Sequence, residues 1–240
     1  MLGATSDLAE ALIYRFAPLA SKLNLTARQP ADLVPLCADL RVRELCPMIE
    51  SHAFDTQNID FQLLKKLADE TDLLIVAVGY LGEQRLAEQN DGEAERILTT
   101  NFTGLARAIS VFAEKMESAA GSNPQSVIVV SSVAGERGRA SNYFYGAAKA
   151  GMTAYLSGLR HRLFSKKIHV MTVLPGFMDT KMTAGLPLPK PLTASPTVAA
   201  AHIFRAWKKG RGTVYVLPVW RLIMLIIRNL PDFIFLKMKL

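Results

Sequence analysis

The 240-residue sequence is poor in cysteine, has no long apolar run and carries no pattern of metal ligands. Two cysteines, Cys37 and Cys46, cannot build a disulfide framework, which favours a reduced, cytoplasmic protein. No apolar stretch approaches the ~20 residues that a membrane-spanning helix needs. The four histidines have no metal-site spacing, so no metal is expected. A secretory signal is not expected either, because a glycine turn begins at Gly3.

The net charge of +7 is concentrated near the C-terminal end of the chain. Residues 205–240 contain eight lysines or arginines and a single acid, Asp232, so residues 1–204 are neutral overall. A uniformly basic chain would suggest nucleic acid, and no such partner is expected here. A neutral body with a basic and apolar tail instead indicates contact with an anionic surface.

Short apolar segments typical of strands alternate along the chain with segments whose apolar residues recur at helical spacing. This alternation predicts an α/β fold. Because apolar strands alternate with helices, we predict a Rossmann-like, doubly wound parallel sheet flanked by helices on both faces. Met1 and Leu2 can form only the stub of a first strand. The predicted strands are 22–27, 49–54, 73–78, 126–131, 168–174 and 212–217, and the predicted helices are 8–23, 31–43, 61–71, 93–119, 145–164 and 196–209.

Tyr145 and Lys149 lie four residues apart in a predicted helix, so their side chains project from one face. A neighbouring ammonium stabilises phenolate and is expected to lower the tyrosine pKa from about 10. Such a tyrosine can deliver a proton to a carbonyl oxygen while a cofactor delivers hydride to the carbon. Without further context, this spacing is more often that of two surface residues.

Two further polar positions supply that context. Ser131 and Ser132 follow an apolar strand, and Ser132 precedes Tyr145 by 13 residues. Ligands of parallel sheets bind beyond the carboxyl ends of the strands, where a serine can polarise a carbonyl. The alternative is that the serines only turn the chain. Asn101 lies in a predicted helix, where asparagine is a poor former, and either anchors a proton relay or is a tolerated polar residue.

In their order and spacing these residues resemble the short-chain dehydrogenase/reductase family over nearly the whole chain. The resemblance implies an NAD(P)-dependent oxidoreductase with Ser132, Tyr145 and Lys149 as catalytic residues, assisted by Asn101. Ser132 is preferred over Ser131 because the family's serine usually precedes the Val-Ala-Gly turn. The cofactor-binding residues expected from the resemblance are Gly3, Thr5, Ser6, Asp7, Leu8, Arg28, Asp55, Val78, Gly79, Tyr145, Lys149, Pro175, Gly176 and Thr180.

The glycine turn departs from the family pattern, because Asp7 and Ala9 replace two glycines. Backbone amides at a helix start still attract pyrophosphate. Asp7 would repel that anion unless it caps the helix and points away, which its position allows. Asp55 resembles the family residue that contacts adenine, and Thr180 resembles the one that holds the nicotinamide carboxamide.

Arg28 bears on the choice of cofactor. The second strand ends at Ala27, where an NAD-specific protein would usually place an acid for the ribose hydroxyls. A guanidinium suits a 2′-phosphate, so NADPH is favoured and NADH remains the alternative. Arg28 could equally be a solvated turn residue.

Several stretches resemble the decaprenylphosphoryl-2-keto-ribose reductases, which reduce a 2-keto sugar on a polyprenyl phosphate. These stretches are 77–83, 131–139, 142–149, 180–183 and 221–231. Those proteins also carry an acid at the position of Asp7, but they are associated with NADH, so Arg28 is a departure. Arg137 and Arg139 beside the serine loop are candidates for binding a substrate phosphate, or are only solvated.

We predict one domain, since no linker or repeat divides the chain. Residues 1–218 form the reductase domain, with 181–196 as a mobile substrate lid, and 219–240 form a basic amphipathic tail of the same domain. Two short amphipathic segments of the tail can lie in a bilayer interface at the inner face of the membrane. Alternatively, their apolar residues cover the core or build a homo-oligomer interface.

The leading hypothesis is therefore a ketone reductase for a lipid-linked or other amphipathic substrate at a membrane surface. A second hypothesis is a non-catalytic dinucleotide-binding scaffold, which the altered glycine turn leaves open. A third is a soluble short-chain reductase of a small carbonyl compound, with a tail that forms a dimer.

Overall fold

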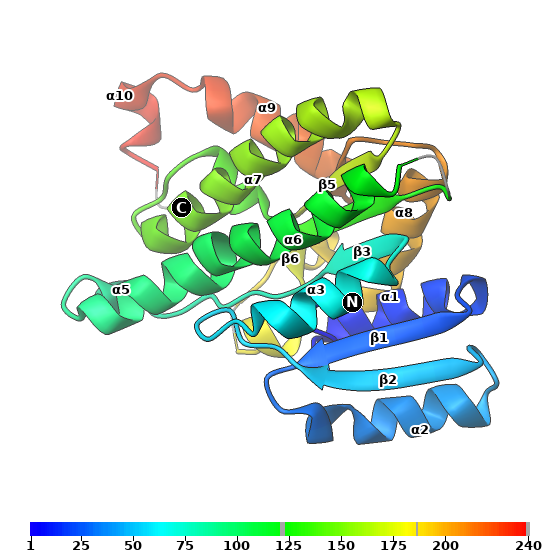
Figure 1. Ribbon diagram of the computed structural model, residues 1–240. Helices are drawn as coiled ribbons and strands as arrows, with labels where there is room; N and C mark the ends of the chain where they lie inside the picture. Colours follow the sequence, from blue (N-terminus) through cyan, green and yellow to red (C-terminus); the bar gives the residue numbers. More distant parts are fainter. Residues whose placement is uncertain (121–122, 186, 239–240) are drawn as a thin grey trace.

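A parallel sheet forms the centre of the molecule (Figure 1). The computed structural model describes residues 1–120, 123–185 and 187–238, so Leu186 of the predicted lid and Lys239 and Leu240 of the predicted tail lie outside the described residues. The strands are β1 (Lys22–Ala27), β2 (Met48–Ala53), β3 (Leu73–Val76), β4 (Ser126–Val130), β5 (His169–Pro175) and β8 (Thr213–Val216). The pairs are β2–β1 on one side and β3–β4–β5–β8 on the other.

Leu2 joins these two parts, as expected for a strand stub. It forms one parallel bridge with Thr26 of β1 and another with Val76 of β3. Its own N–H donates to the Ile75 carbonyl at 2.8 Å, and its carbonyl accepts from the Ala77 N–H at 2.9 Å. The predicted Rossmann-like parallel sheet is thus confirmed, with Leu2 between β1 and β3.

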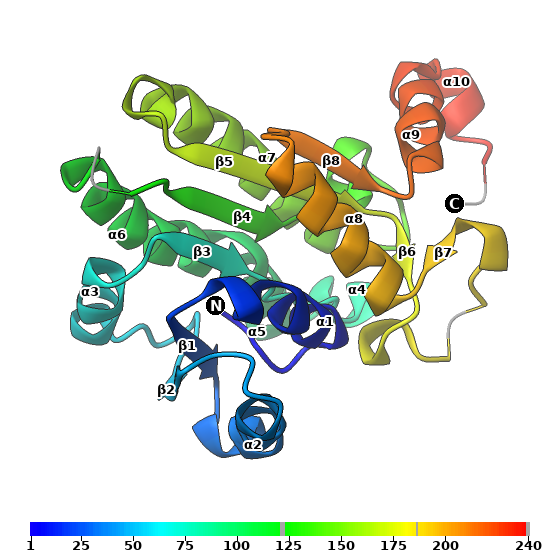
Figure 2. The ribbon, with the colours of Figure 1, turned by 90° about the vertical axis from the view of Figure 1, so that its right-hand side faces the viewer.

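Helices cover both faces of the sheet (Figure 2). The helices α3 (Phe61–Asp69), α6 (Gly104–Ser118) and α7 (Tyr143–Leu163) pack against one face. The opposite face is covered by α1 (Asp7–Phe16) and α8 (Pro196–Lys208), while α2 (Val34–Val42) packs beside β1 and β2. Because both faces are covered, the core residues of β4 and β5 are almost all buried, which explains their uniformly apolar sequence.

The observed elements differ from the predicted ones mainly at their ends. The first helix stops at Phe16 and continues only as the short 3-10 turn η1 (Ala17–Leu19). The long predicted helix 93–119 consists of α5 (Asp91–Leu98), a π-helical turn η3 (Thr99–Thr103) and α6. A short helix α4 (Gln84–Ala87) was not predicted, because four residues are too few to show a helical period.

The segment after β5 and the tail complete the fold. The segment contains β6 (Phe177–Met178), η6 (Lys181–Thr183), η7 (Lys190–Leu192) and β7 (Thr193–Ala194), and β6 pairs with β7. The tail forms α9 (Val219–Asn229) and α10 (Asp232–Phe235) at one corner of the molecule (Figure 1). Within the described ranges, no helix has both the length and the apolar character required to cross a bilayer.

The remaining short turns are η2 (Pro30–Leu33), η4 (Val133–Glu136) and η5 (Phe164–Lys166). η4 follows β4 directly, at the carboxyl edge of the sheet. It is the turn that carries the serine loop, defined here as residues 131–137.

Candidate active site

A cavity of about 380 Å³ opens at the carboxyl ends of β1, β2 and β3. Seven of the predicted cofactor-binding residues line it, namely Gly3, Thr5, Ser6, Arg28, Asp55, Val78 and Gly79. The sequence analysis missed eight lining residues, which are Ala27, Phe54, Thr56, Gln57, Ala77, Tyr80, Arg96 and Thr100. Most of these directly follow a strand, and Arg96 and Thr100 lie at helical i,i+4 spacing just before Asn101, so position alone could have indicated them.

The turn at Gly3 fits an elongated ligand with phosphate groups. Gly3 has φ of +79°, and a Cβ there would lie 2.6 Å from Cγ2 of Val78, so only glycine suits this position. The turn leads into α1, and the residues just before this helix face the cavity. Thr5 and Ser6 line it, and amides at a helix start attract phosphate oxygens.

The cap of α1 is Ser6, not Asp7. The Ser6 hydroxyl accepts a hydrogen bond from the Ala9 N–H at 3.2 Å. The Asp7 carboxylate points toward another segment, where it accepts from the Lys181 N–H at 2.7 Å. Leu8 is buried in the core between α1 and α8, so neither Asp7 nor Leu8 lines the cavity. The expectation that Asp7 points away holds, but the predicted capping role was wrong.

Two arginines reach the cavity. Arg28 is exposed at its rim and forms no hydrogen bond or ion pair with any residue that the structure describes. The Arg96 guanidinium lies over the Tyr80 ring, 4.1 Å from its centroid. Asp55 turns inward to accept from the Gln57 N–H at 2.9 Å. Arg28 is therefore free to meet an anion at the ribose end of a dinucleotide.

Asn101 lies in the π-helical turn and is fully buried. Its amide oxygen accepts from the Tyr80 N–H at 3.1 Å, and its amide nitrogen donates to the carbonyls of Tyr80 (2.6 Å) and Ile97 (2.8 Å). Asn101 thus holds the loop after β3 in place. A π-helical turn of this kind is frequent at functional sites.

Gly79 connects the cavity with the predicted catalytic residues. A Cβ at Gly79 would lie 3.7 Å from Oδ1 of Asn101 and 3.9 Å from Nζ of Lys149. Lys149 is only 2% exposed, and its ammonium donates to the Val130 carbonyl at 3.3 Å. The same ammonium lies 5.6 Å from the centroid of the Tyr145 ring. Lys149 and Asn101 therefore lie near Gly79, with Tyr145 beside the lysine, although none of the three is itself a lining residue of the cavity.

Burial has the largest effect on the pKa values of Tyr145 and Lys149. It lowers the pKa of Lys149 to about 8 and raises the pKa of Tyr145 to about 12. A hydrogen bond with Ser132 lowers the Tyr145 pKa by less than burial raises it. The prediction of a lowered tyrosine pKa was wrong, because desolvation of the buried phenolate outweighs the lowering effect of Ser132. At neutral pH the tyrosine is a protonated acid and the lysine is charged.

The two serines of the loop point in different directions. The Ser131 hydroxyl is buried, donates to the Lys149 carbonyl at 3.1 Å and contacts Oγ1 of Thr153 at 2.8 Å. The Ser132 hydroxyl accepts from the Ala134 N–H at 3.1 Å and lies close enough to Tyr145 to lower the pKa of that tyrosine. This arrangement supports the choice of Ser132 over Ser131.

Pro175, Gly176 and Thr180 do not line the cavity. The space beside Gly176 is filled by Trp220 of the tail, because a Cβ there would lie 1.9 Å from Cε2 of the indole. Thr180 caps η6 in a reciprocal capping box with Thr183. They precede Met182, whose Cε lies 3.4 Å from the position that a Cβ of Gly79 would occupy.

Arg137 is engaged by the tail, against the suggestion that it binds a substrate phosphate. Its guanidinium donates to the carbonyls of Arg228 and Leu230, forms a 2.6 Å ion pair with Asp232 and lies 4.4 Å from the centroid of Phe235. Arg139 is different, because its buried Nε has no hydrogen-bond partner among the described residues. Burial also lowers the pKa of Arg139.

Comparison with known proteins shows which family the chain belongs to. A family model described as short chain dehydrogenase matches residues 1–190. The chain belongs to the short-chain dehydrogenase family. An uncharacterized oxidoreductase, Rv2073c, of Mycobacterium tuberculosis is 30% identical to this short-chain dehydrogenase over 243 residues, covering 99% of this chain and 95% of the relative. As a family member, the protein is an NAD(P)-dependent oxidoreductase.

Two further proteins are similar to part of this sequence or to its fold. A 3-oxoacyl-[acyl-carrier-protein] reductase of Vibrio harveyi is 33% identical over 136 residues, which is 55% of this chain and 54% of that protein. A short-chain dehydrogenase from Sphingobium yanoikuyae, solved in complex with NADPH, superposes with a TM-score of 0.81 at 20% identity. It covers 97% of this chain and 95% of its own, which shows that the fold is shared.

Proposed function

We propose that this short-chain dehydrogenase reduces a ketone to an alcohol, or catalyses the reverse reaction, through Ser132, Tyr145, Lys149 and Asn101. The observation that carries the proposal is the meeting of Lys149 Nζ and Asn101 Oδ1 at Gly79, beside the Tyr145 ring. A bound nicotinamide cofactor supplies or accepts the hydride at the carbonyl carbon. The cavity beside Gly79, with its glycine turn and helix start, suits such a cofactor.

The chain's own residues handle the carbonyl oxygen. Ser132 donates a hydrogen bond to it and polarises the bond. Tyr145, protonated at neutral pH, transfers its hydroxyl proton to the oxygen as the carbonyl is reduced. The charged Lys149 stabilises the phenolate that is left. Asn101 holds the loop after β3 in place, so that Gly79 stays next to Lys149.

For the cofactor we propose a preference for NADPH over NADH. Arg28 supports it, since this guanidinium stands at the cavity rim without a partner among the described residues. The Sphingobium relative of the same fold was solved with NADPH. An arginine can donate two parallel hydrogen bonds to a 2′-phosphate. The 2′-hydroxyl of NADH cannot accept such a pair.

For the substrate we propose an amphipathic ketone, with a 2-keto sugar linked to a lipid phosphate as the leading example. Arg139 supports an anionic group on the substrate, because its buried Nε has no partner among the described residues and it follows the serine loop. The Vibrio harveyi relative is named a 3-oxoacyl-[acyl-carrier-protein] reductase, which makes a β-keto acyl group the alternative substrate.

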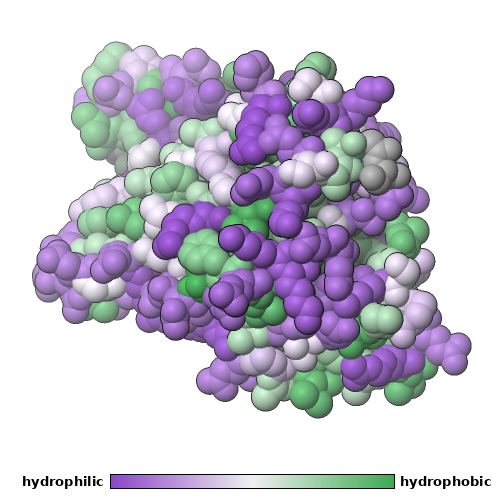
Figure 3. All heavy atoms as spheres, in the orientation of Figure 1, coloured by the Kyte–Doolittle hydropathy of each residue, from purple (hydrophilic) through white to green (hydrophobic). Residues whose placement is uncertain are grey.

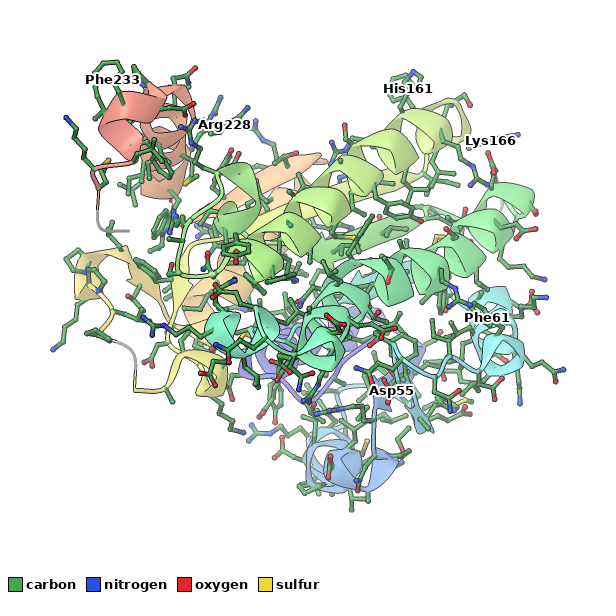
Figure 4. All side chains as sticks on the ribbon, turned by 90° about the vertical axis from the view of Figure 1, so that its left-hand side faces the viewer. Asp55, Phe61, His161, Lys166, Arg228 and Phe233 are labelled. Atoms are coloured by element: carbon green, nitrogen blue, oxygen red, sulfur yellow. The ribbon has the colours of Figure 1, made fainter. Side chains whose placement is uncertain are left out.

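The tail supports a peripheral contact with an anionic membrane at its inner face. Trp220, Met224 and Ile227 of α9 are buried against the domain, while Leu222, Leu225 and Ile226 point outward with exposed fractions of 56–61%. Phe233 projects from α10 at the edge of the molecule, near Arg228 (Figure 4). Apolar and hydrophilic residues are mixed over this corner (Figure 3), as in helices that lie in a bilayer interface.

Turnover is tested with the Tyr145→Phe variant. We expect loss of ketone reduction by roughly a thousandfold or more, with NADPH binding retained, because only the proton donor is removed. Normal reduction by this variant would refute the proposed mechanism. Normal cofactor binding by a wild-type protein that reduces no ketone would instead favour a non-catalytic dinucleotide-binding scaffold.

The finer parts of the proposal have separate tests. Fluorescence titration of NADPH and NADH should show a preference that Arg28→Ala removes, and an unchanged preference would contradict the 2′-phosphate role. Vesicles containing anionic phospholipid should pellet the protein, and Leu225→Glu should stop this. If Leu225→Glu instead converts a homo-oligomer to a monomer without changing pelleting, the exposed face is a subunit interface.

A further inference from the structure

Asp7 and Lys181 meet although they are 174 residues apart in the chain. The Lys181 N–H donates to Oδ2 of Asp7 at 2.7 Å, and the Lys181 ammonium lies 3.6 Å from Oδ1. The carboxylate is three-quarters buried, whereas the lysine side chain is 87% exposed. Because the ammonium is solvated, the backbone hydrogen bond is the stronger part of this contact.

Lys181 opens the turn η6, which carries two residues toward the catalytic end of the site. Thr180 immediately precedes it and caps the turn through Thr183. Met182 follows it, and its Cε lies 3.4 Å from the position that a Cβ of Gly79 would occupy. That position is also 3.9 Å from Nζ of Lys149, so the turn and the catalytic lysine both lie close to Gly79.

The other attachments of this turn are local. The Thr183 hydroxyl donates to the Met178 carbonyl, five residues back. The Asp179 N–H donates to the Ala194 carbonyl of β7, at the other end of the same segment. Asp7 differs from these attachments, because it ties the turn to α1 at the phosphate end of the cavity (Figure 2).

We propose that Asp7 is a positioning residue, which holds the turn Thr180–Thr183 close to Gly79 and the catalytic lysine through the Lys181 amide. This inference rests on the proposed reductase function and adds a residue that touches neither substrate nor reacting atoms. It also explains why an acid is tolerated beside a phosphate site. The carboxylate is turned away from the cavity and is compensated by the lysine ammonium at 3.6 Å.

Three variants separate the parts of the contact. Asp7→Ala removes the acceptor and the charge. Asp7→Asn keeps an oxygen that can accept from the Lys181 N–H but removes the charge. Lys181→Met removes the ammonium and keeps the amide. The cap of α1 belongs to Ser6, so the helix keeps its N-terminal cap in all three variants.

The first readout is limited trypsin digestion of the protein without added cofactor. Trypsin can cut this segment after Lys181. Lys190 is not a site, because Pro191 follows it. Loss of one charge-assisted hydrogen bond corresponds to a change of roughly tenfold. We therefore expect Asp7→Ala to be cut after Lys181 roughly tenfold faster, and Asp7→Asn within about twofold of wild type. Cleavage after the exposed Arg28 serves as the internal control and should not change.

The second readout is steady-state kinetics with NADPH and a soluble ketone. Asp7→Ala should lower kcat/KM by roughly tenfold, with Asp7→Asn and Lys181→Met within about twofold of wild type. Equal rates for wild type and Asp7→Ala in both readouts would overturn the proposal. So would an Asp7→Asn variant as impaired as Asp7→Ala, because the amide contact would then not carry the effect.

The two readouts also separate this inference from the proposed function. If wild type reduces no ketone, the reductase proposal fails, whereas the digestion pattern still reports whether Asp7 holds the turn. If wild type turns over and Asp7→Ala behaves like it in both readouts, only the positioning role fails.

Discussion

The contact between Gly176 and Trp220 predicts that adding one methyl group will displace the tail from the domain. In Gly176→Ala, the new Cβ would stand 1.9 Å from Cε2 and 2.1 Å from Nε1 of the indole. Since carbon atoms pack at about 3.5–4.0 Å, the ring must move by roughly 1.5 Å or more. Trp220 is only 3% exposed, so it has no free space into which to move.

Moving the indole breaks two further contacts. Trp220 donates from Nε1 to the Leu192 carbonyl at 3.0 Å and packs edge-on against Phe177, with centroids 5.1 Å apart. We expect Gly176→Ala to lower the free energy of unfolding by about 3 kcal/mol, the upper range for overpacking. Urea unfolding followed by circular dichroism measures this as a shift of the midpoint at constant slope.

A double-mutant cycle with Trp220→Ala tests the reasoning itself. Trp220→Ala alone should destabilise by about 3–5 kcal/mol, since a buried indole is lost. In that background, Gly176→Ala should add less than about 1 kcal/mol, because the clash no longer exists. Additive effects of the two substitutions would show that the glycine is required for another reason, such as contact with a ligand.

Three other predictions concern the site and its surroundings. Burial lowers the pKa of Lys149 to about 8, so kcat/KM for reduction should be flat below pH 8 and fall above it as the ammonium loses its proton; a flat profile to pH 10 would contradict this. Asn101→Ala leaves the Tyr80 peptide unpaired and should lower the free energy of unfolding by about 2–4 kcal/mol, which urea titration would reveal. Arg137→Ala releases α10 and should speed trypsin cleavage after Lys237 severalfold, whereas Asp232→Asn should have a smaller effect, since that carboxylate is 86% exposed.

The strands and most helices could be predicted because each lies against one or two buried layers. β1 occupies residues 22–27 as predicted, and α7 and α8 begin or end within two residues of their predicted bounds. A sheet buried on both faces requires apolar strands, so the pattern follows directly from burial. Ser132 could also be preferred over Ser131 through the family resemblance, because the family's serine usually precedes the Val-Ala-Gly turn.

Other features depend on contacts between distant parts of the chain and leave no local pattern. The direction of Asp7 is set by a backbone amide 174 residues away, and the role of Arg137 is set by the tail. The pKa of Tyr145 depends on how completely the folded chain covers the ring, which neither its spacing from Lys149 nor its neighbours in sequence reveal. The sequence therefore indicated the catalytic residues near Gly79. It did not indicate the distant partners of Asp7 and Arg137 or the effect of burial on the pKa of Tyr145.

The single-residue link at Leu2 has a consequence for ligand-induced stability. The segments carrying Arg28 and Asp55 belong to the β1–β2 part of the sheet, while those carrying Gly79, Ser132 and Tyr145 belong to the β3–β8 part. Within the described sheet, bridges join the β1–β2 pair to the four strands β3–β4–β5–β8 only at Leu2. A dinucleotide that contacts both parts would connect them across this short link at Leu2. Its binding should therefore protect the amides of Thr26 and Ala77 from solvent exchange more than those deep in β4 and β5.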